Sequence, residues 1–156
     1  MPEIEMMVSL VIPDNTAITA TNVLRKMGYS KLLNIKREEY YKFTFDGDSK
    51  SFADKISKVD IIMNFNKHRA VFKKPQDPWG DRRPRILVKD KGDMGSKLAG
   101  TLKHQLGVAK IKKVEKGILW TLAIDEKPEN VAALAWEMAR KLLYNRHYQT
   151  ADIVSK

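Results

Sequence analysis

Hydrophobic positions along this chain change their spacing in a regular order. A continuous apolar run predicts a first strand, apolar residues three and four apart then predict a helix, and two strand-like stretches and a second helical stripe follow. The predicted order is strand, helix, strand, strand, helix and a short last strand, at residues 7–12, 15–27, 32–35, 41–45, 49–63 and 70–72. Strands with and without helices between them favour an α+β fold.

The second half of the chain repeats this order. Asn66-Lys67-His68 resembles Asn145-Arg146-His147, and this match fixes a shift of 79 residues that requires no gap. The corresponding stretches lie at 86–88, 94–106, 111–114, 120–124, 128–142 and 152–154. A repeat of this size predicts that one structural unit occurs twice in the chain.

Polar residues and glycines mark the ends of the first helix in each half. Asp14 and Asp93 precede these helices, as N-cap residues do, and Gly28 and Gly107 follow them, where a left-handed C-cap favours glycine. A twofold relation between the halves would also make the two aspartates a pair of acids. Capping accounts for both residues, and we favour it.

The sequence therefore divides into a unit at residues 1–72, a connecting segment at 73–85 and a second unit at 86–156. Units of about 65 residues bury only about 60% of their unfolded surface and are marginally stable alone. We expect two tandem β-α-β-β-α(-β) units that pair as a pseudo-dimer within the chain, with antiparallel sheets that carry their helices on one face. Trp79 in the connecting segment either folds back or anchors a partner, and we favour folding back.

The net charge of +10 is spread over both halves and the connecting segment. A solvated surface explains this spread as well as a polyanionic partner does, so nucleic acid is kept only as an alternative. The absence of cysteine excludes disulfides and thiolate chemistry and agrees with a reducing compartment. No apolar run is long enough for a membrane span, and Glu3 and Glu5 stand where a secretory signal would carry positive charge. We expect a cytoplasmic protein.

Catalytic and metal-binding patterns do not emerge. His68, His104 and His147 are widely separated, and no His or carboxylate pair has metal-ligand spacing. His68 and His147 fall at the same place in the two halves, which favours a shared structural role. The stretch 92–95 matches the G-x-x-G loop of KH domains, but it follows a strand and contains Asp93, so nucleic-acid binding is not favoured. Neither catalytic residues nor a cofactor are expected.

Three stretches of the second half resemble one family. GDMGSKLAGTLKHQLGV, VEKGILWTLAID and WEMARKLLYNRHYQTADIV are similar to segments of PurS, the small subunit of phosphoribosylformylglycinamidine (FGAM) synthase. The matching segments are the turn into the first helix, the approach to the third strand and the end of the second helix. The resemblance spans residues 86–154 and extends through the 79-residue shift to 7–72, so the chain resembles a fused, tandem PurS.

The resemblance implies an accessory role in purine biosynthesis. PurS-like subunits pair and bridge the glutaminase and the ATP-dependent synthetase of this ligase, and they help ammonia pass from glutamine to its acceptor. Two fused units would be a covalent form of that dimer, and such pseudo-dimers could form a homodimer through free sheet edges.

Candidate partner-binding residues lie at the ends of the second helices, in the connecting segment and in the segment before the third strand of the second half. They are Asn66, Lys67, His68, Trp79, Arg82, Arg83, Lys116, Asn145, Arg146 and His147. Arginine and tryptophan are enriched among residues that dominate binding energy. A nucleic-acid-binding tandem domain and a stand-alone regulator that binds a small ligand are the alternative functions.

Overall fold

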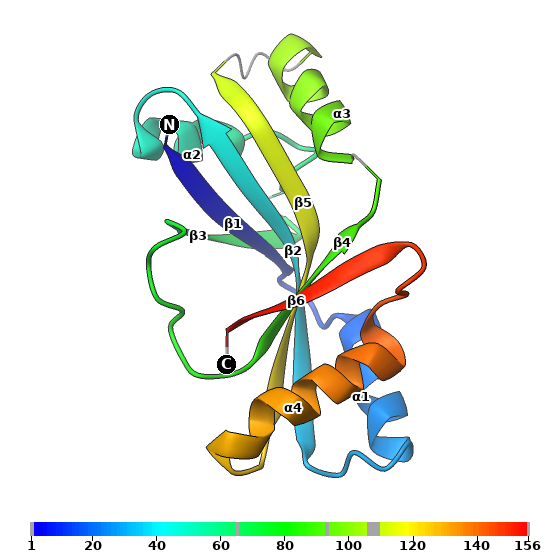
Figure 1. Ribbon diagram of the computed structural model, residues 1–156. Helices are drawn as coiled ribbons and strands as arrows, with labels where there is room; N and C mark the ends of the chain where they lie inside the picture. Colours follow the sequence, from blue (N-terminus) through cyan, green and yellow to red (C-terminus); the bar gives the residue numbers. More distant parts are fainter. Residues whose placement is uncertain (1, 65, 93, 106–109, 156) are drawn as a thin grey trace. The chain divides into compact units, whose positions relative to one another are not determined.

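The computed structural model of the chain describes residues 2–64, 66–92, 94–105 and 110–155. It shows an α+β fold with one six-stranded sheet (Figure 1), in the order β3-β1-β2-β5-β4-β6. The elements are β1 Glu3–Leu10, α1 Asn15–Lys26, β2 Leu32–Phe45, α2 Ser49–Ile56, β3 His68–Lys73, β4 Arg85–Asp90, α3 Met94–Gly100, the π-helix η1 Thr101–Gln105, β5 Ile111–Ile124, α4 Pro128–Met138, the π-helix η2 Ala139–Leu143 and β6 Gln149–Ser155.

Neighbouring strands are antiparallel. β1 pairs in this way with β2 and β3, and β4 with β5 and β6. Two backbone hydrogen bonds fix the direction of β5 against β2, because Asp46 N donates to Lys110 O at 3.0 Å and Asp125 N donates to Lys31 O at 2.8 Å. The start of each long strand thus lies beside the end of the other.

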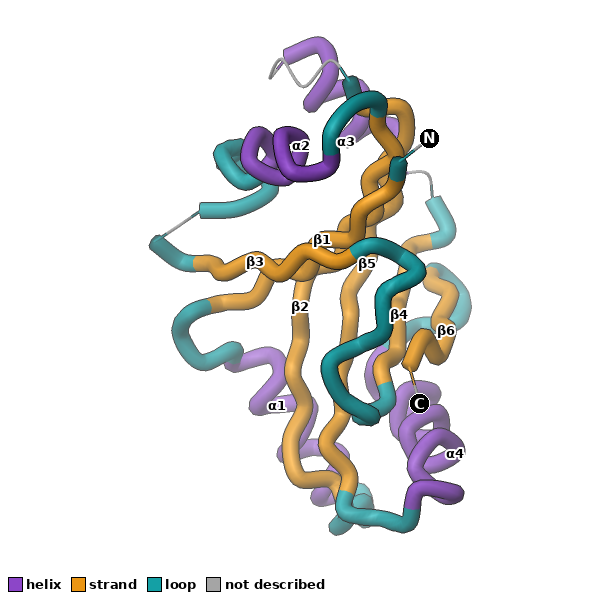
Figure 2. Tube along the Cα trace, turned by 90° about the vertical axis from the view of Figure 1, so that its left-hand side faces the viewer, coloured by secondary structure: helices purple, strands orange, loops and turns teal. Residues whose placement is uncertain are grey.

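The prediction of separate second and third strands in each half is wrong. Leu32–Phe45 and Ile111–Ile124 are each one unbroken strand of 14 residues (Figure 2), related by the shift of 79. The apolar pattern is interrupted because each strand serves two different cores. Leu32 and Ile35 pack in one core, whereas Tyr41, Phe43 and Phe45 pack in the other.

The two compact units of the structure do not coincide with the two halves of the sequence. Unit 1 comprises Met1–Ile12, Glu39–Asp77 and Gly92–Gly117, and unit 2 comprises Pro13–Glu38, Pro78–Lys91 and Ile118–Lys156. Each unit therefore contains the first helix of one sequence half and the second helix of the other. β2 and β5 each contribute one end to each unit.

The core of unit 1 lies between its strands and the helices α2, α3 and η1. Alternate residues of β1 and β2 face it, since the printed register places Ile4 opposite Phe43 and Met6 opposite Tyr41. Phe52 of α2 stacks on Phe45 with ring centroids 4.2 Å apart, and Leu102 of η1 is fully buried in the same cluster. Both helical segments therefore cover one face of the strands of this unit.

Unit 2 repeats this layout with α1, α4 and η2. Its buried cluster contains Ala20 and Leu24 of α1, Ala135 and Met138 of α4, Ala139 and Leu143 of η2, and Leu32, Ile35, Ile86, Val88, Trp120 and Leu122 of the strands. A hydrogen bond also joins Tyr29 to α4, because the Tyr29 hydroxyl donates to Glu137 at 3.2 Å. Helices from both sequence halves again pack on the same face.

The first helix has the predicted ends in the first half of the chain. Asp14 Oδ1 accepts from Thr16 N at 3.0 Å, which confirms the N-cap, and Gly28 has a φ of +107° just after the C-cap Met27. Asp14 also pairs with Arg37 at 2.9 Å. The equivalent predictions at Asp93 and Gly107 lie outside the described residues.

The second helix of the first half is shorter than predicted. α2 ends at Ile56, although the apolar stripe extends to Met63. Val59, Ile62 and Met63 still contact the core of unit 1, but they do so from turns. Apolar spacing therefore located the buried side chains correctly and assigned the wrong backbone.

Gly95 of α3 lies against the backbone of β5. A Cβ on Gly95 would be 2.0 Å from the carbonyl oxygen of Val114, a distance that requires the backbone to shift. We expect Gly95→Ala to lower the free energy of unfolding by about 1 to 3 kcal/mol. Gly100→Ala in the same helix is the matched control, since nothing lies within 4 Å of its Cβ position. Urea denaturation that gives equal midpoints for both variants would contradict the close contact.

Candidate functional site

Two similar turns precede the edge strands β3 and β6. In the first, Asn64 Oδ1 accepts from Asn66 N and His68 Nδ1 accepts from Asn64 N. In the second, Asn145 Oδ1 accepts from His147 N and Gln149 Oε1 accepts from Asn145 N. The carbonyl of the residue before each edge strand accepts from the residue that follows the neighbouring strand: Lys67 O from Val11 N, after β1, and Tyr148 O from Lys91 N, after β4.

These hydrogen bonds correct the match of residues on which the alignment of the two halves was based. Asn64 corresponds to Asn145 and His68 to Gln149, a shift of 81 residues, so the alignment of Asn66 with Asn145 is wrong by two positions. The strand pairs at the two edges also depart from the shift of 79, because Val8 opposite Ala70 corresponds to Val88 opposite Ala151, with shifts of 88 − 8 = 80 and 151 − 70 = 81 residues. The shift of 79 holds for the long strands, and loops of different length change it elsewhere.

The two histidines consequently do not share a role. His68 is half-buried and its ring nitrogen closes the first turn, whereas Gln149 does this in the second turn and His147 is exposed. Arg146 is also exposed at this turn. The candidate residues at 66–68 lie in unit 1 and those at 145–147 lie in unit 2.

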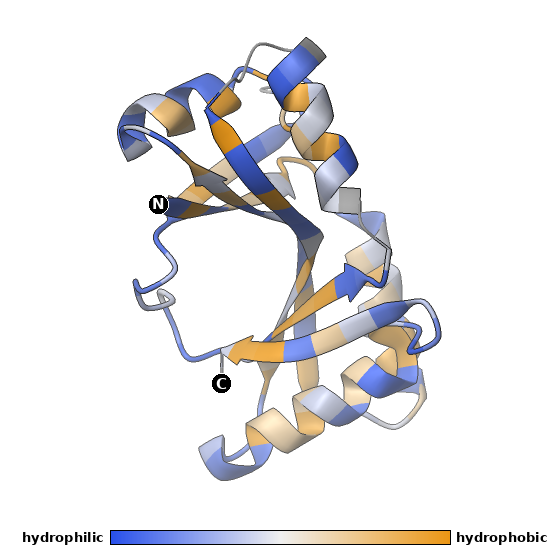
Figure 3. Cartoon of the chain, turned by 45° about the horizontal axis from the view of Figure 1, so that its top comes forward, coloured by the Kyte–Doolittle hydropathy of each residue, from blue (hydrophilic) through white to orange (hydrophobic). Residues whose placement is uncertain are grey.

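The connecting segment folds back on unit 2, as predicted for Trp79. The Trp79 indole N–H donates to Val154 O at 3.2 Å, and the Arg85 guanidinium lies 4.8 Å from the centre of its ring. The segment is almost entirely hydrophilic (Figure 3), so these contacts rather than a core hold it. Lys73 and Arg85, placed in this segment by the sequence, belong to β3 and β4.

Arg85 organises the segment and was not among the predicted site residues. It is buried, donates to Arg83 O at 3.1 Å and Ser155 Oγ at 3.3 Å, and pairs with Asp81 at 3.1 Å. Its position next to the apolar stretch that begins at Ile86 is the one sequence signal that indicates burial. An arginine on the edge of such a stretch is otherwise indistinguishable from a solvated one.

Asp81 is held as an anion by its neighbours. The side-chain hydrogen bonds from Arg83, at 2.8 and 3.1 Å, together with a bond from the Arg83 backbone and the charge of Arg85, lower the pKa of Asp81 well below its ordinary value. The carboxyl is still 40% exposed, which limits its contribution to stability.

This lowered pKa predicts a loss of stability in acid. A carboxyl whose pKa is lower in the folded state stabilises above its unfolded pKa, 3.8, and loses that contribution as the pH falls toward its folded pKa. We expect Asp81→Asn to be less stable than wild type at pH 7, by less than about 1 kcal/mol. The difference in stability between wild type and Asp81→Asn should become smaller between pH 5 and pH 2, as measured by thermal melts. A gap that widens in acid would contradict this assignment.

Lys116 lies in the unit 1 part of β5, apart from the other candidates. Its ammonium is 5.8 Å from the centre of the Tyr41 ring, and Tyr41 donates to Glu39 at 3.1 Å. Nearby, Lys42 pairs with Glu115 at 3.9 Å. The predicted residues thus form separate groups in the two units rather than one site.

A buried polar cluster in unit 1 was missed by the sequence interpretation. Tyr40 donates to Glu5 at 2.5 Å, and Lys73 pairs with the other oxygen of Glu5 at 2.7 Å. Lys73 also donates to the carbonyls of Lys74 and Asp77, which fastens the start of the connecting segment. Burial, followed by the hydrogen bond to Glu5, raises the pKa of Tyr40 far above its ordinary value, so its hydroxyl remains a donor.

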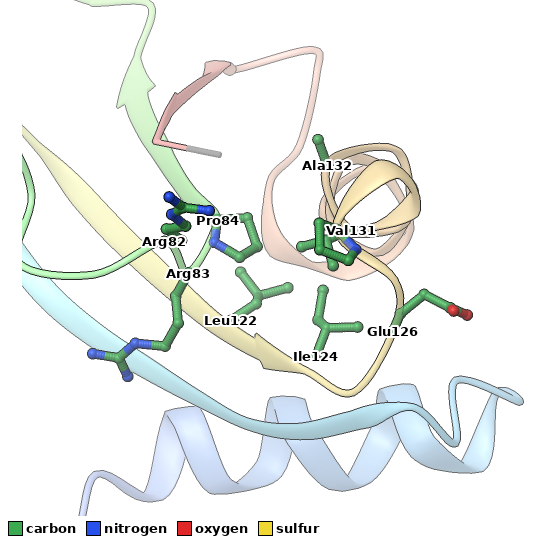
Figure 4. A pocket seen from close by; sticks show the side chains of 9 residues that line it. Arg82, Arg83, Pro84, Leu122, Ile124, Glu126, Val131 and Ala132 are labelled. Carbon is green, nitrogen blue, oxygen red and sulfur yellow. The ribbon is translucent and has the colours of Figure 1, made fainter.

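A pocket of about 620 Å³ in unit 2 contains two of the predicted residues, Arg82 and Arg83 (Figure 4). Apolar side chains from the end of β5, the first turns of α4 and the approach to β4 form its walls. They are Pro84, Leu122, Ile124, Pro128, Val131 and Ala132, and Glu126 completes the lining. Such a volume with mostly apolar walls is typical of small-molecule sites.

The described part of the chain contains neither a candidate metal site nor a helix that could span a membrane. No group of three or more His, Asp or Glu side chains there could hold a metal ion. None of its helices combines the length and the apolar character that crossing a bilayer requires.

No protein-family model matches the sequence, and no curated protein is significantly similar to it.

Proposed function

We propose that the chain is a non-catalytic scaffold subunit of the PurS type, which bridges a glutaminase and an ATP-dependent synthetase in FGAM synthase. The resemblance of residues 86–154 to PurS is the source of this proposal. The observation that supports it best is the exchange of segments between the two halves of the chain. Two identical subunits that exchanged the same segments would form a dimer, and fusion would make that dimer a single chain.

The recurrence of elements supports the finer part of the proposal, a tandem pair of PurS-like units. A shift of 79 carries α1 Asn15–Lys26 onto the span of α3 and η1, and carries β2 onto β5. The edge strands β3 and β6 end the sheet on the two sides in the same way. Each half thus supplies a β-α-β-α-β sequence.

Divergence between the halves gives the proposed scaffold two different surfaces for two partners. The turn before β3 presents Asn66 and Lys67, whereas the turn before β6 presents Arg146 and His147. All four residues are exposed. A side-chain difference at corresponding turns is what a fused pair needs in order to distinguish a glutaminase from a synthetase.

Affinity purification from the native host, with glutamine and ATP present, tests the proposal. We expect a glutaminase and a synthetase to be retained with the tagged chain. The double variant Arg146→Ala, His147→Ala should lose one of the two, while the control Arg140→Ala, an exposed arginine in the same unit, should retain both. Retention of neither enzyme by the wild-type chain would exclude the proposed role.

A further inference from the structure

We propose that unit 2 binds a small carboxylic acid with an apolar body, in the pocket between the end of β5, the start of α4 and Pro84. The whole lining comes from unit 2, so the site is complete within that unit. The inference concerns a ligand rather than a protein partner. It is therefore independent of the PurS-type role.

The walls of the pocket are apolar and fixed. Leu122 is fully buried and Pro84 is buried beside it, and the Leu122 N–H donates to the Pro84 carbonyl at 3.1 Å. This bond ties the approach to β4 to β5. Val131 faces them from α4 (Figure 4). An apolar ligand would gain about 25 cal/mol for each Å² of apolar surface that it removes from water here.

The charged residues around the pocket determine whether a ligand should carry a negative or a positive charge. Arg83 is held by Asp81 through two side-chain hydrogen bonds and extends away from the pocket in Figure 4. Glu126 points outward at the other end, and its carboxylate accepts from Lys127 N at 2.9 Å. Among the described residues, Arg82 has no hydrogen-bond or ion-pair partner.

Arg82 is thus the charged group at this pocket that remains available to a ligand. Arg82 lines the pocket together with Pro84 (Figure 4), where its guanidinium can donate to a carboxylate while the rest of the molecule fills the apolar space. A cationic ligand would meet Arg82 without a free acid to compensate, because Glu126 is directed outward. A molecule with one anionic end and an apolar body satisfies both features.

Fluorescence titration with 1-pyrenebutyrate tests the site, with the neutral 1-pyrenebutanol as the matched probe. We expect Arg82→Ala to raise the Kd of the acid about tenfold, the effect of one charge-assisted hydrogen bond, and to leave the Kd of the alcohol unchanged. Val131→Trp should abolish binding of both probes by filling the pocket. Arg140→Ala removes the same charge from an exposed position of η2 in unit 2, outside the pocket lining, and should change neither Kd.

Circular dichroism melts establish that each variant is folded before it is titrated. The proposal is overturned if wild type does not bind the acid, or if Val131→Trp binds it as wild type does. Equal losses for Arg82→Ala and Arg140→Ala would also overturn it, because they would assign the effect to overall charge. Loss of partner proteins in the purification experiment would not affect these outcomes.

Discussion

Two fragments made by ending one chain at Asp77 and starting another at Pro78 should each be unfolded alone and should fold when mixed. The reason is the exchange of segments between the halves. Without residues 78–156, unit 1 loses Leu102, Ile111 and Val114 from its core, and without residues 1–77, unit 2 loses Leu24 and Leu32. Each loss of a large buried side chain forfeits about 1.5 to 3 kcal/mol, which exceeds the margin of so small a core.

Circular dichroism and amide NMR spectra of each fragment, alone and mixed in equal amounts, provide the measurement. The control is the intact chain with a protease site inserted near Gly80 and cleaved after folding. Its two pieces should remain associated in size-exclusion chromatography. A fragment that folds as a stable monomer would show that the halves are independent tandem domains.

Lys73→Ala should be the most destabilising substitution of a charged residue in unit 1. The side chains of Lys73 and Glu5 are each only 11% exposed, so removal of Lys73 leaves a buried negative charge whose remaining side-chain donor among the described residues is Tyr40. Breaking a buried ion pair in this way costs about 3 kcal/mol or more. The free energy of unfolding in urea measures the loss.

The neighbouring exposed residue supplies the control for this substitution. Lys74→Ala removes the same charge from the surface and should change stability by no more than about 0.5 kcal/mol. Adding Glu5→Gln to Lys73→Ala should recover part of the loss, because a neutral amide still accepts from Tyr40. If both lysine variants are equally stable, the Glu5–Lys73 pair contributes no more to the free energy of unfolding than an exposed charge does.

Much of the fold could be predicted from the spacing of apolar residues. The alternation at Tyr41, Phe43 and Phe45 predicted a strand, Asp14 and Gly28 predicted the ends of α1, and Pro128 begins α4 as expected. The spacing reports which side of an element is buried, but not against which other element. For that reason the exchange of segments was not visible in the sequence.

The candidate residues were predicted less well, for a related reason. Arg82 and Arg83 lie at a pocket and Trp79 folds back, but Arg85 and Lys73, which hold the connecting segment in place, were read as part of it. A charged side chain at the edge of an apolar stretch carries no local mark of burial. The Asn64 and Asn145 turns were likewise hidden, because a loop of different length displaced the alignment by two residues.

The division of unit 1 into three chain segments also determines when the protein can fold during synthesis. Its last segment ends at Gly117, so its core cannot close until the chain has left the ribosome as far as that residue. Until then the unit 1 part of β2 lacks its neighbour β5, and the apolar faces of β1 and β2 lack the cover of α3 and η1. Long-range pairing of this kind slows folding and exposes strands to aggregation. An interrupted unit of this kind therefore completes its core later in synthesis than an uninterrupted tandem domain would.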